Sequence, residues 1–344
     1  MSTIRDVAAY AGVSVGTASK VLNDVQGVKS CNRDKVLAAI RDLDYRPSAV
    51  AQSLSRGWSN TIGVVIPDLH NPLYSEIVRG IEDRALSASY HVFLCNSAHN
   101  PVREADYIDS LTRHRIDGLI VVPVDSTARY AHHLRSVHVP LVLVERTVAG
   151  VEADSVVFDN ETSVYEAMLY LRVLGHSRVA MINGPKTIST ASEREQGFRH
   201  AYRDFKFQKP CTVLHGRFDF ESGVSLAVQL WREQRDITAV VCTSALLALG
   251  VIDGFGHVGY QIPDDVSLVS CEDIPMFNAA QPNLTAIHQT AYDFGAAACE
   301  AMLKRLSTPQ VGRQRDHIVI TGHLEDRGSV RRLATQDVIA ESAV

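Results

Sequence analysis

The sequence predicts a small all-α helix-turn-helix unit followed by a two-lobed α/β body of doubly wound parallel sheets. Two short helical patterns surround a glycine within the first 23 residues. Beyond residue 60, apolar runs of strand length alternate with amphipathic segments of helix length, and this alternation occurs twice in succession. At 344 residues the chain is too long for one ordinary core, so two or three domains are expected.

The first helical pattern ends at a glycine, and the second begins at a serine. Gly12 can adopt the left-handed conformation that ends a helix, and Ser14 can cap the helix that follows. A third pattern, with Ser30 or Asn32 as its cap, completes a three-helix core. The apolar residues of the three patterns are Ile4, Val7, Ala8, Ala11, Ala18, Val21, Leu22, Val36, Leu37, Ile40 and Leu43.

The outer face of the second helix carries short side chains and one cation. Such a face lets a helix lie deep in the major groove of DNA. Spacing alone leaves open a second interpretation, a helical hairpin that only packs on a core, because glycine-containing helix turns are common. The residues of this face are Val15, Gly16, Thr17, Ser19, Lys20 and Asn23.

The strands predicted for the body are continuous apolar runs, as expected for parallel strands that are covered on both faces. Ligands bind such sheets at the carboxyl ends of the strands, so two successive sheets predict two lobes with a cleft between them. The predicted strands are 61–67, 91–96, 118–123, 140–145, 178–183, 212–215, 238–242 and 267–271. The predicted helices are one from about residue 74, then 101–114, 127–136, 161–174, 193–205, 221–233 and 246–255.

Several segments, in order along the chain, resemble one known family. The segment from Ile4 through Leu54, including the run that begins at Tyr45, resembles the DNA-binding domain and hinge helix of the LacI/GalR family of bacterial transcription regulators. The later segments that resemble this family are 62–74, 117–120, 192–198, 262–267, 284–289 and 327–329. The resemblance implies a periplasmic-binding-protein-like body and a repressor whose operator affinity is controlled by a small molecule, expected to be a sugar or sugar derivative.

The resemblance also implies how the chain is divided. The chain is expected to cross between the lobes three times. The expected parts are a DNA-binding domain at 1–47, a hinge helix and linker at 48–60, lobe 1 at about 61–158 and 288–317, lobe 2 at about 159–287 and 318–333, and a disordered tail at 334–344.

The resemblance places a leucine wedge in the hinge helix. Hinge helices of this family pair across a homodimer and insert a leucine into the minor groove at the centre of a pseudo-palindromic operator. In this chain that leucine is Leu54, although packing of Leu54 within its own helix remains an alternative. The expected DNA-binding residues are Thr3, Ser14, Val15, Gly16, Thr17, Ser19, Lys20, Asn23, Tyr45, Ser48, Ala51 and Leu54.

Candidate effector residues lie at the ends of the predicted strands. Arg194 stands where the family places an arginine that forks onto effector hydroxyls or carboxylates, although a lone helical arginine is often a solvated cation. The chain departs from the family at Ser244, where an asparagine is typical, and at Glu272, where an aspartate is typical. The expected effector-binding residues are Asp68, Leu73, Tyr74, Asp125, Asp159, Thr190, Arg194, Phe218, Ser244 and Glu272.

Charge and cysteine content exclude several classes of protein. The net charge is −5, but residues 1–60 carry +3, as expected for a protein that contacts phosphates with one end only. The six cysteines show no paired metal-ligand spacing, and no catalytic set recurs, so we expect no metal, no cofactor and no enzymatic activity. Without an apolar leader or spanning segment, a cytoplasmic protein is expected. Two alternatives are a solute-binding protein of a transport system and a sugar-modifying enzyme.

Overall fold

The computed structural model describes residues 2–23, 25–45, 58–207, 211–278, 282–307 and 314–333. The chain divides into two compact units, Met1–Asn60 and Thr61–Val344. The predicted hinge helix and the predicted tail lie outside the described residues. Among the described residues, no helix is both long and apolar enough to cross a membrane.

The first unit is a bundle of α1 (Ile4–Ala11), α2 (Val15–Leu22) and α3 (Ser30–Asp42). Gly12 ends α1 with a φ of 65°, and the Ser14 hydroxyl accepts the backbone N–H of Thr17 at 3.1 Å, so both predicted signals are confirmed. The core consists of Val7, Ala8, Ala11, Ala18, Val21, Val36 and Ala39.

Two predictions for the third helix are wrong. Neither Ser30 nor Asn32 caps α3, because the helix already begins at Ser30 and Lys29 occupies the cap position without a side-chain bond. Leu37 was expected in the core but is exposed, because Val36 and Ala39 already cover the other two helices.

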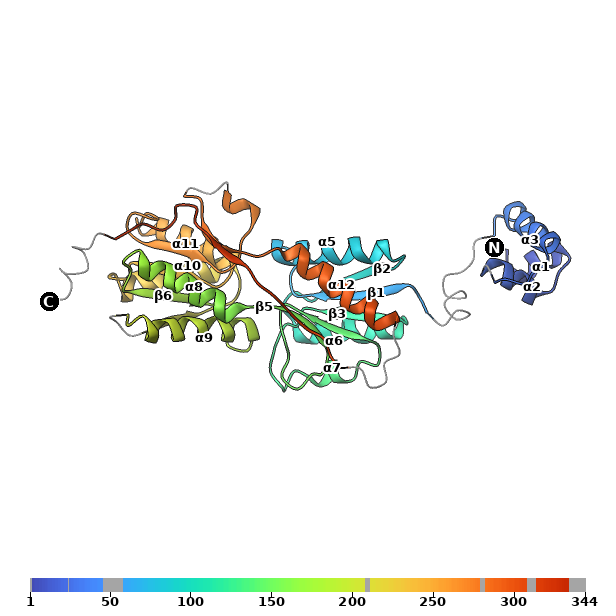
Figure 1. Ribbon diagram of the computed structural model, residues 1–344, viewed down its shortest axis with the longest axis horizontal. Helices are drawn as coiled ribbons and strands as arrows, with labels where there is room; N and C mark the ends of the chain where they lie inside the picture. Colours follow the sequence, from blue (N-terminus) through green and yellow to red (C-terminus); the bar gives the residue numbers. More distant parts are fainter. Residues whose placement is uncertain are drawn as a thin grey trace. The chain divides into compact units, whose positions relative to one another are not determined.

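The second unit begins with a six-stranded parallel sheet that forms lobe 1 (Figure 1). Its strand order is β11-β5-β4-β3-β1-β2. Helices α5 and α12 pack so closely that a Cβ on Gly295 would stand 1.9 Å from the carbonyl oxygen of Ile77, which only glycine permits. The strands are β1 (Thr61–Ile66), β2 (His91–Asn96), β3 (Gly118–Val121), β4 (Leu141–Val144), β5 (Asp154–Phe158) and β11 (His317–Ile320); the helices are α5 (Pro72–Ser87), α6 (Pro101–Arg113), α7 (His132–Arg135) and α12 (Ala291–Ser307).

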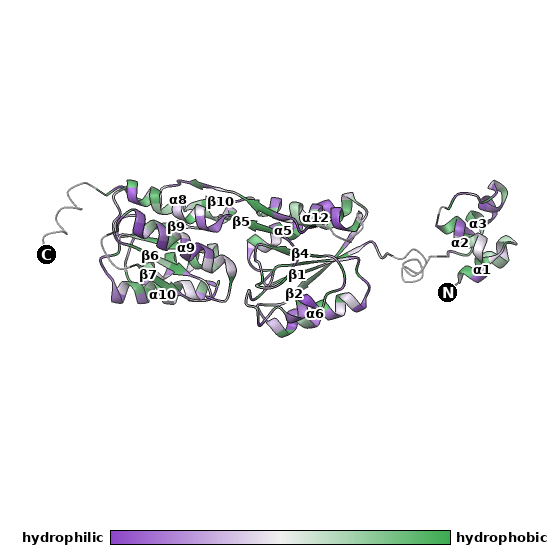
Figure 2. Ribbon diagram, turned by 60° about the horizontal axis from the view of Figure 1, so that its bottom comes forward, coloured by the Kyte–Doolittle hydropathy of each residue, from purple (hydrophilic) through white to green (hydrophobic). Residues whose placement is uncertain are grey.

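A second six-stranded sheet forms lobe 2, with the order β12-β10-β9-β8-β6-β7. All neighbours are parallel except β10 and β12, which are antiparallel. The strands are rich in apolar residues, which are green in Figure 2. This composition is expected because helices cover both faces of the sheet. The strands are β6 (Val179–Asn183), β7 (Thr212–His215), β8 (Ala239–Cys242), β9 (Ser267–Ser270), β10 (Thr285–His288) and β12 (His323–Glu325); the helices are α8 (Asn160–Val173), α9 (Ser189–Asp204), α10 (Phe220–Glu233), α11 (Ala245–His257) and the 3₁₀ turn η1 (Pro275–Asn278).

The described chain passes between the two sheets three times, after β5, after β10 and after β11. The boundary expected near residue 317 is a few residues too early, because His317–Ile320 pairs with β5 in the sheet of lobe 1. The helix expected at 127–136 is also shorter than predicted, since only His132–Arg135 is helical. These passages place the carboxyl ends of β1, β3 and β4 opposite those of β6 and β7.

Candidate functional site

The exposed face of α2 has the form expected of a DNA-reading surface. Ser14, Val15, Gly16 and Lys20 are exposed, and the space above Gly16 is open apart from the Ser14 hydroxyl. Small side chains around one lysine therefore leave the helix backbone free to approach a base edge. The remaining positions of this face, which are half-buried, are Thr17, Ser19 and Asn23.

Other predicted DNA contacts have structural roles of their own. The Thr3 hydroxyl accepts the backbone N–H of Asp6, whose carboxylate accepts the backbone N–H of Thr3, so this pair forms a capping box. Tyr45 packs against the three-helix core. Ser48, Ala51 and Leu54 lie outside the described residues and stay predictions.

A cavity of about 440 Å³ lies between the two lobes, at the carboxyl ends of the strands. Hydrogen bonds join the lobes beside it: Ser126 N–H donates to the Thr187 carbonyl at 2.8 Å, and Ser189 N–H donates to Ser126 Oγ at 2.9 Å. The lobes are therefore closed on each other in this structure. The cavity is lined by Asp68, Ala98, His99, Val124 and Arg146 from lobe 1 and by Pro185, Thr187, Ile188, Arg217, Phe218 and Asp219 from lobe 2.

Arg146 is a buried cation that lines this cavity, and sequence reasoning missed it. Its guanidinium donates to the Pro123 carbonyl at 2.8 Å and to the Tyr74 hydroxyl at 2.5 Å. It also lies 5.8 Å from the ring centres of Tyr74 in lobe 1 and Phe218 in lobe 2. Arg146 thus bridges the lobes through a cation–π contact at the wall of the cavity.

A strained turn directs Arg146 inward. Glu145 has a φ of 66°, which is uncommon for a residue with a side chain, and the next N–H, that of Arg146, bonds back to the Val144 carbonyl at 2.7 Å. Arg146 Nε lies 2.7 Å from Glu145 Oε2, an ion pair whose geometry makes no hydrogen bond. Burial opposes the charge of Arg146, but the neighbouring Glu145 carboxylate raises its pKa. The signal in the sequence was its position directly after a predicted strand.

Arg194, by contrast, is occupied by partners within lobe 2. Its Nε donates to Asn160 Oδ1 at 2.8 Å, its Nη1 donates to the Thr243 carbonyl, and Nη1 lies 3.3 Å from Glu272 Oε1. Burial raises the pKa of Glu272, while Arg194 opposes that shift. Arg194 and Glu272, each predicted to bind the effector, instead pair with each other within lobe 2, and their contact with an effector stays a prediction.

The structure distributes the other predicted effector residues widely. Asp68 and Phe218 line the cavity. Tyr74 is buried, and its burial raises its pKa well above the usual value, so its hydroxyl is a neutral acceptor for Arg146. The others have roles in packing, turns or caps: Leu73 lies in the core, Asp125 accepts Thr127 N–H, Asp159 caps α8, Ser244 caps α11 and Thr190 is buried.

His99 is a second lining residue that the sequence prediction omitted. Burial lowers its pKa, as does Arg146, while Asp68 and Asp219 oppose the shift. Its Nε2 lies 4.0 Å from Asp68 Oδ2. At neutral pH His99 therefore offers one neutral donor and one neutral acceptor, which suits hydroxyl or amide groups of a ligand.

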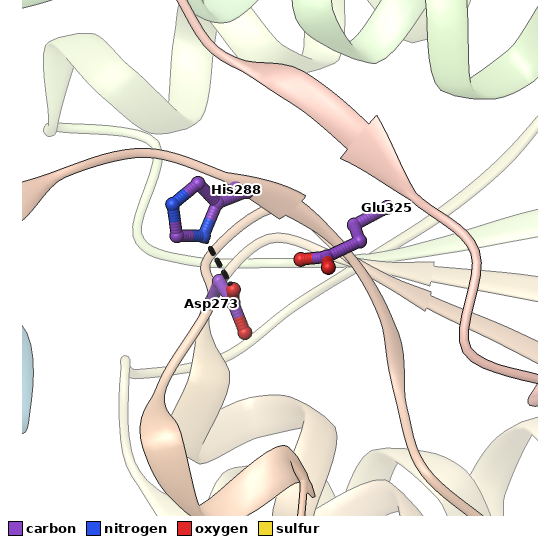
Figure 3. Close-up of side chains that lie close together, drawn as sticks. All are labelled: Asp273, His288 and Glu325. Carbon is purple, nitrogen blue, oxygen red and sulfur yellow. Dashed lines mark hydrogen bonds and ion pairs between the residues drawn. The ribbon is translucent and has the colours of Figure 1, made fainter.

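Asp273, His288 and Glu325 lie close enough to one another to suggest a metal site (Figure 3). However, the Arg327 guanidinium donates to both oxygens of Asp273, at 2.6 and 2.7 Å, and to Glu325. Arg327 thus supplies the positive charge that a metal ion would bring, and the cluster instead ties the ends of β10 and β12 to the loop after β9. We assign no metal to it.

An interlobe ligand cavity and a helix-turn-helix unit on one chain define a ligand-responsive DNA-binding regulator. Two family models match: "Bacterial regulatory proteins, lacI family" at residues 3–48, and "Periplasmic binding proteins and sugar binding domain of LacI family" at residues 59–327. The chain belongs to the LacI family of bacterial regulatory proteins. The resemblance identified from the sequence is therefore confirmed, as is the fold class.

Known relatives cover nearly the whole chain. The HTH-type transcriptional repressor PurR of Histophilus somni (strain 129Pt) is 32% identical over 335 residues, which are 97% of this chain and 100% of the relative. The Lac repressor dimer, solved bound to operator and the anti-inducer ONPF, is 26% identical with a TM-score of 0.84, over 96% of this chain and 99% of that one. A LacI family regulator from Enterococcus faecium with bound ribose is 26% identical with a TM-score of 0.71, over 80% of this chain and 100% of that one.

These relatives are transcription regulators, so the prediction that the chain is not an enzyme is confirmed. The chain is a DNA-binding transcription regulator.

Proposed function

We propose that this protein is a homodimeric repressor whose affinity for a pseudo-palindromic operator depends on a small molecule held between its lobes. The observation that carries this proposal is the closed interlobe cavity, because residues of both lobes line it and a ligand there contacts both at once. A ligand that favours one lobe angle changes the operator affinity only through such unequal contacts. The proposed site of action is the cytoplasm, where bacterial operators lie.

The proposed effector is a neutral, polar molecule of the sugar type. Charged side chains that line the cavity already have partners: Arg217 Nε pairs with Asp219 at 2.5 Å, and Asp68 accepts from His70 at 2.9 Å. Arg146 likewise pairs with Glu145. The Asp68 and Asp219 carboxylates, which also line the cavity, would repel an anionic ligand, whereas hydroxyl groups can bond to the lone pairs and N–H groups that remain.

A thermal-shift screen separates these ligand classes. Neutral monosaccharides and disaccharides, with ribose and cellobiose among them, are compared with their phosphates. At 100 times its dissociation constant, a ligand stabilises the body by about 2.7 kcal/mol. Stabilisation by a neutral sugar supports the proposal, whereas stabilisation by sugar phosphates alone contradicts the neutral effector.

The proposed dimer uses the edge strand β2. Phe93 and Leu94 on this strand are 53% and 39% exposed, and Leu86 on the preceding helix is 66% exposed. An exposed apolar sheet edge of this kind is typical of a protein–protein interface. The Lac repressor relative is a dimer. Analytical ultracentrifugation should show a dimer that Phe93→Asp converts to monomer, while Val173→Asp, at another exposed apolar site, stays dimeric. A dimeric Phe93→Asp variant would place the interface elsewhere.

The DNA function is tested with a duplex that the wild-type protein selects from a random-sequence library. Lys20→Ala should weaken binding to this duplex by roughly 1–3 kcal/mol, the range for a base contact. Lys35→Ala is the control, because Lys35 is exposed on α3. An equal effect of both variants would reduce Lys20 to a nonspecific phosphate contact.

In the same proposal the hinge segment with Leu54 wedges into the operator centre, so Leu54→Ala should lower both the bending of the DNA and the specific affinity.

A further inference from the structure

A second cavity, of about 390 Å³, lies in lobe 1 at the amino ends of three strands of the sheet. Strands β4, β5 and β11 are parallel neighbours, so the residues that precede these strands lie together at their amino ends. His138 precedes β4, Glu152 precedes β5 and Arg315 precedes β11, and all three line this cavity. The effector cavity lies at the carboxyl ends of the strands, so the two cavities are separate.

One arginine of the second cavity is fixed in position by a glycine turn. Arg135 Nε donates to the Gly150 carbonyl at 2.8 Å. Gly150 has a φ of 76°, and a Cβ at that position would stand 2.2 Å from a guanidinium nitrogen of Arg135. The absence of a side chain at Gly150 therefore makes room for the guanidinium, whose Nη groups keep their donors for a ligand.

The charges of the second cavity favour an anion. In the described lining, Arg135, Arg315 and His138 offer hydrogen-bond donors, and Glu152 is the one carboxylate. Among the described residues, the one hydrogen bond of these three side chains is that of Arg135 to the Gly150 carbonyl. The geometry points to a site for an oxyanion of the phosphate type, bound by the two guanidinium groups and the imidazole.

Inorganic phosphate is the probe for this site. Titration of the full chain by calorimetry should show one saturable phosphate site per protomer. Arg135→Gln and Arg315→Gln should each weaken binding at least tenfold, since each removes charge-assisted hydrogen bonds. Glu152→Gln should strengthen binding, because it removes the only carboxylate among the described residues that line the cavity; mere damage to the fold would not do so. Arg113→Gln, an exposed arginine on α6, is the control, and Phe218→Ala should bind phosphate as the parent does.

Further arms identify the source of the phosphate group. If a backbone phosphate of DNA fills the site, Arg315→Gln weakens binding to an operator duplex with long flanks more than to a minimal duplex, and phosphate competes. If a free phosphate compound fills it, phosphate saturates the protein without DNA and the length of the flanks has no effect. Absence of saturable phosphate binding together with no effect of flank length overturns the proposal, as does an equal loss in Arg113→Gln.

Discussion

The two lobes each bury an arginine near the cleft, and the two arginines are held in opposite ways. Arg194 in lobe 2 is held by Asn160, Thr243 and Glu272, all from its own lobe. Arg146 in lobe 1 lies between a ring of its own lobe and a ring of the other, at the wall of the cavity. Burial alone therefore does not distinguish an arginine that stabilises a lobe from one that joins the two lobes. The difference lies in whose groups satisfy its donors.

This comparison suggests that the two lobes contribute different features to the cavity. Lobe 2 contributes a rigid wall, because the Ser244 and Asp219 caps and the Arg194–Glu272 pair fix its loops. Lobe 1 contributes Arg146 on a strained turn, which depends on Phe218 of the other lobe for one of its contacts. We therefore expect the two arginines to respond differently to the same substitutions.

The largest expected effect is on stability in lobe 2. Arg194→Met should lower the free energy of unfolding by about 3–5 kcal/mol, because it leaves the buried Glu272 carboxylate without its cation. Urea unfolding of the full chain measures this loss. Arg203→Met, on the exposed side of the same helix, is the control and should stay within about 0.5 kcal/mol of the parent. A stable Arg194→Met protein would show that the Arg194–Glu272 pair does not stabilise lobe 2.

Acid should also destabilise lobe 2. Burial lowers the pKa of His176 from 6.5 to about 4, although the hydrogen bond between its Nε2 and the Arg331 carbonyl opposes that shift. Below pH 6.5 His176 is protonated in the unfolded chain, whereas in the folded chain it stays neutral until about pH 4. Stability from this group is thus complete above pH 6.5 and falls by about 3 kcal/mol as the pH decreases through that window.

His176→Gln tests this acid response. The variant should be less stable than the parent at pH 7 but should lose less of its free energy of unfolding between pH 6.5 and 4. Parallel pH profiles for the two proteins would show that other groups set the acid sensitivity.

A smaller effect is expected for ligand affinity. Here substitution of Arg146, and not of Arg194, should have the larger effect. Arg146→Lys keeps the charge beside Glu145 but loses the planar group that bonds Tyr74 and Pro123 and faces two rings. Affinity for the neutral sugar found by thermal shift should fall roughly tenfold, with little change in stability. Arg194→Lys is the matched control and should leave ligand affinity within about twofold. Equal ligand affinities for the two variants would remove the distinction between the lobes.

The sequence predicted the fold well because its signals are local. Gly12 and Ser14 mark the helix turn, and uninterrupted apolar runs mark strands such as β2, whose bounds were predicted exactly as His91–Asn96. The strands β5, β10, β11 and β12 were not predicted; for β12, a segment as short as His323–Glu325 gains strand structure only from a partner far along the chain. Tertiary pairing of this kind has no periodicity to detect.

The site was predicted only in part, for a related reason. Strand ends indicated Asp68 and Phe218, and both line the interlobe cavity because parallel strands bring their carboxyl ends together. Arg146 follows β4 in the same way, but a Glu-Arg pair also suits a solvated surface. Only the positive φ of Glu145 and the rings of both lobes reveal that Arg146 points inward. Neither feature can be read from the order of the residues.

The central claim is that a small molecule in the interlobe cavity controls operator affinity. Fluorescence anisotropy of the selected duplex, measured across ligand concentrations for the parent and for Phe218→Ala, tests it most directly. We predict that the ligand changes parental operator affinity by roughly 5–150-fold. In Phe218→Ala, operator affinity without ligand should be unchanged, and the ligand midpoint should rise at least tenfold. A Phe218→Ala protein that responds at the parental ligand concentration, or a ligand that binds the cavity without changing operator affinity, would contradict the account.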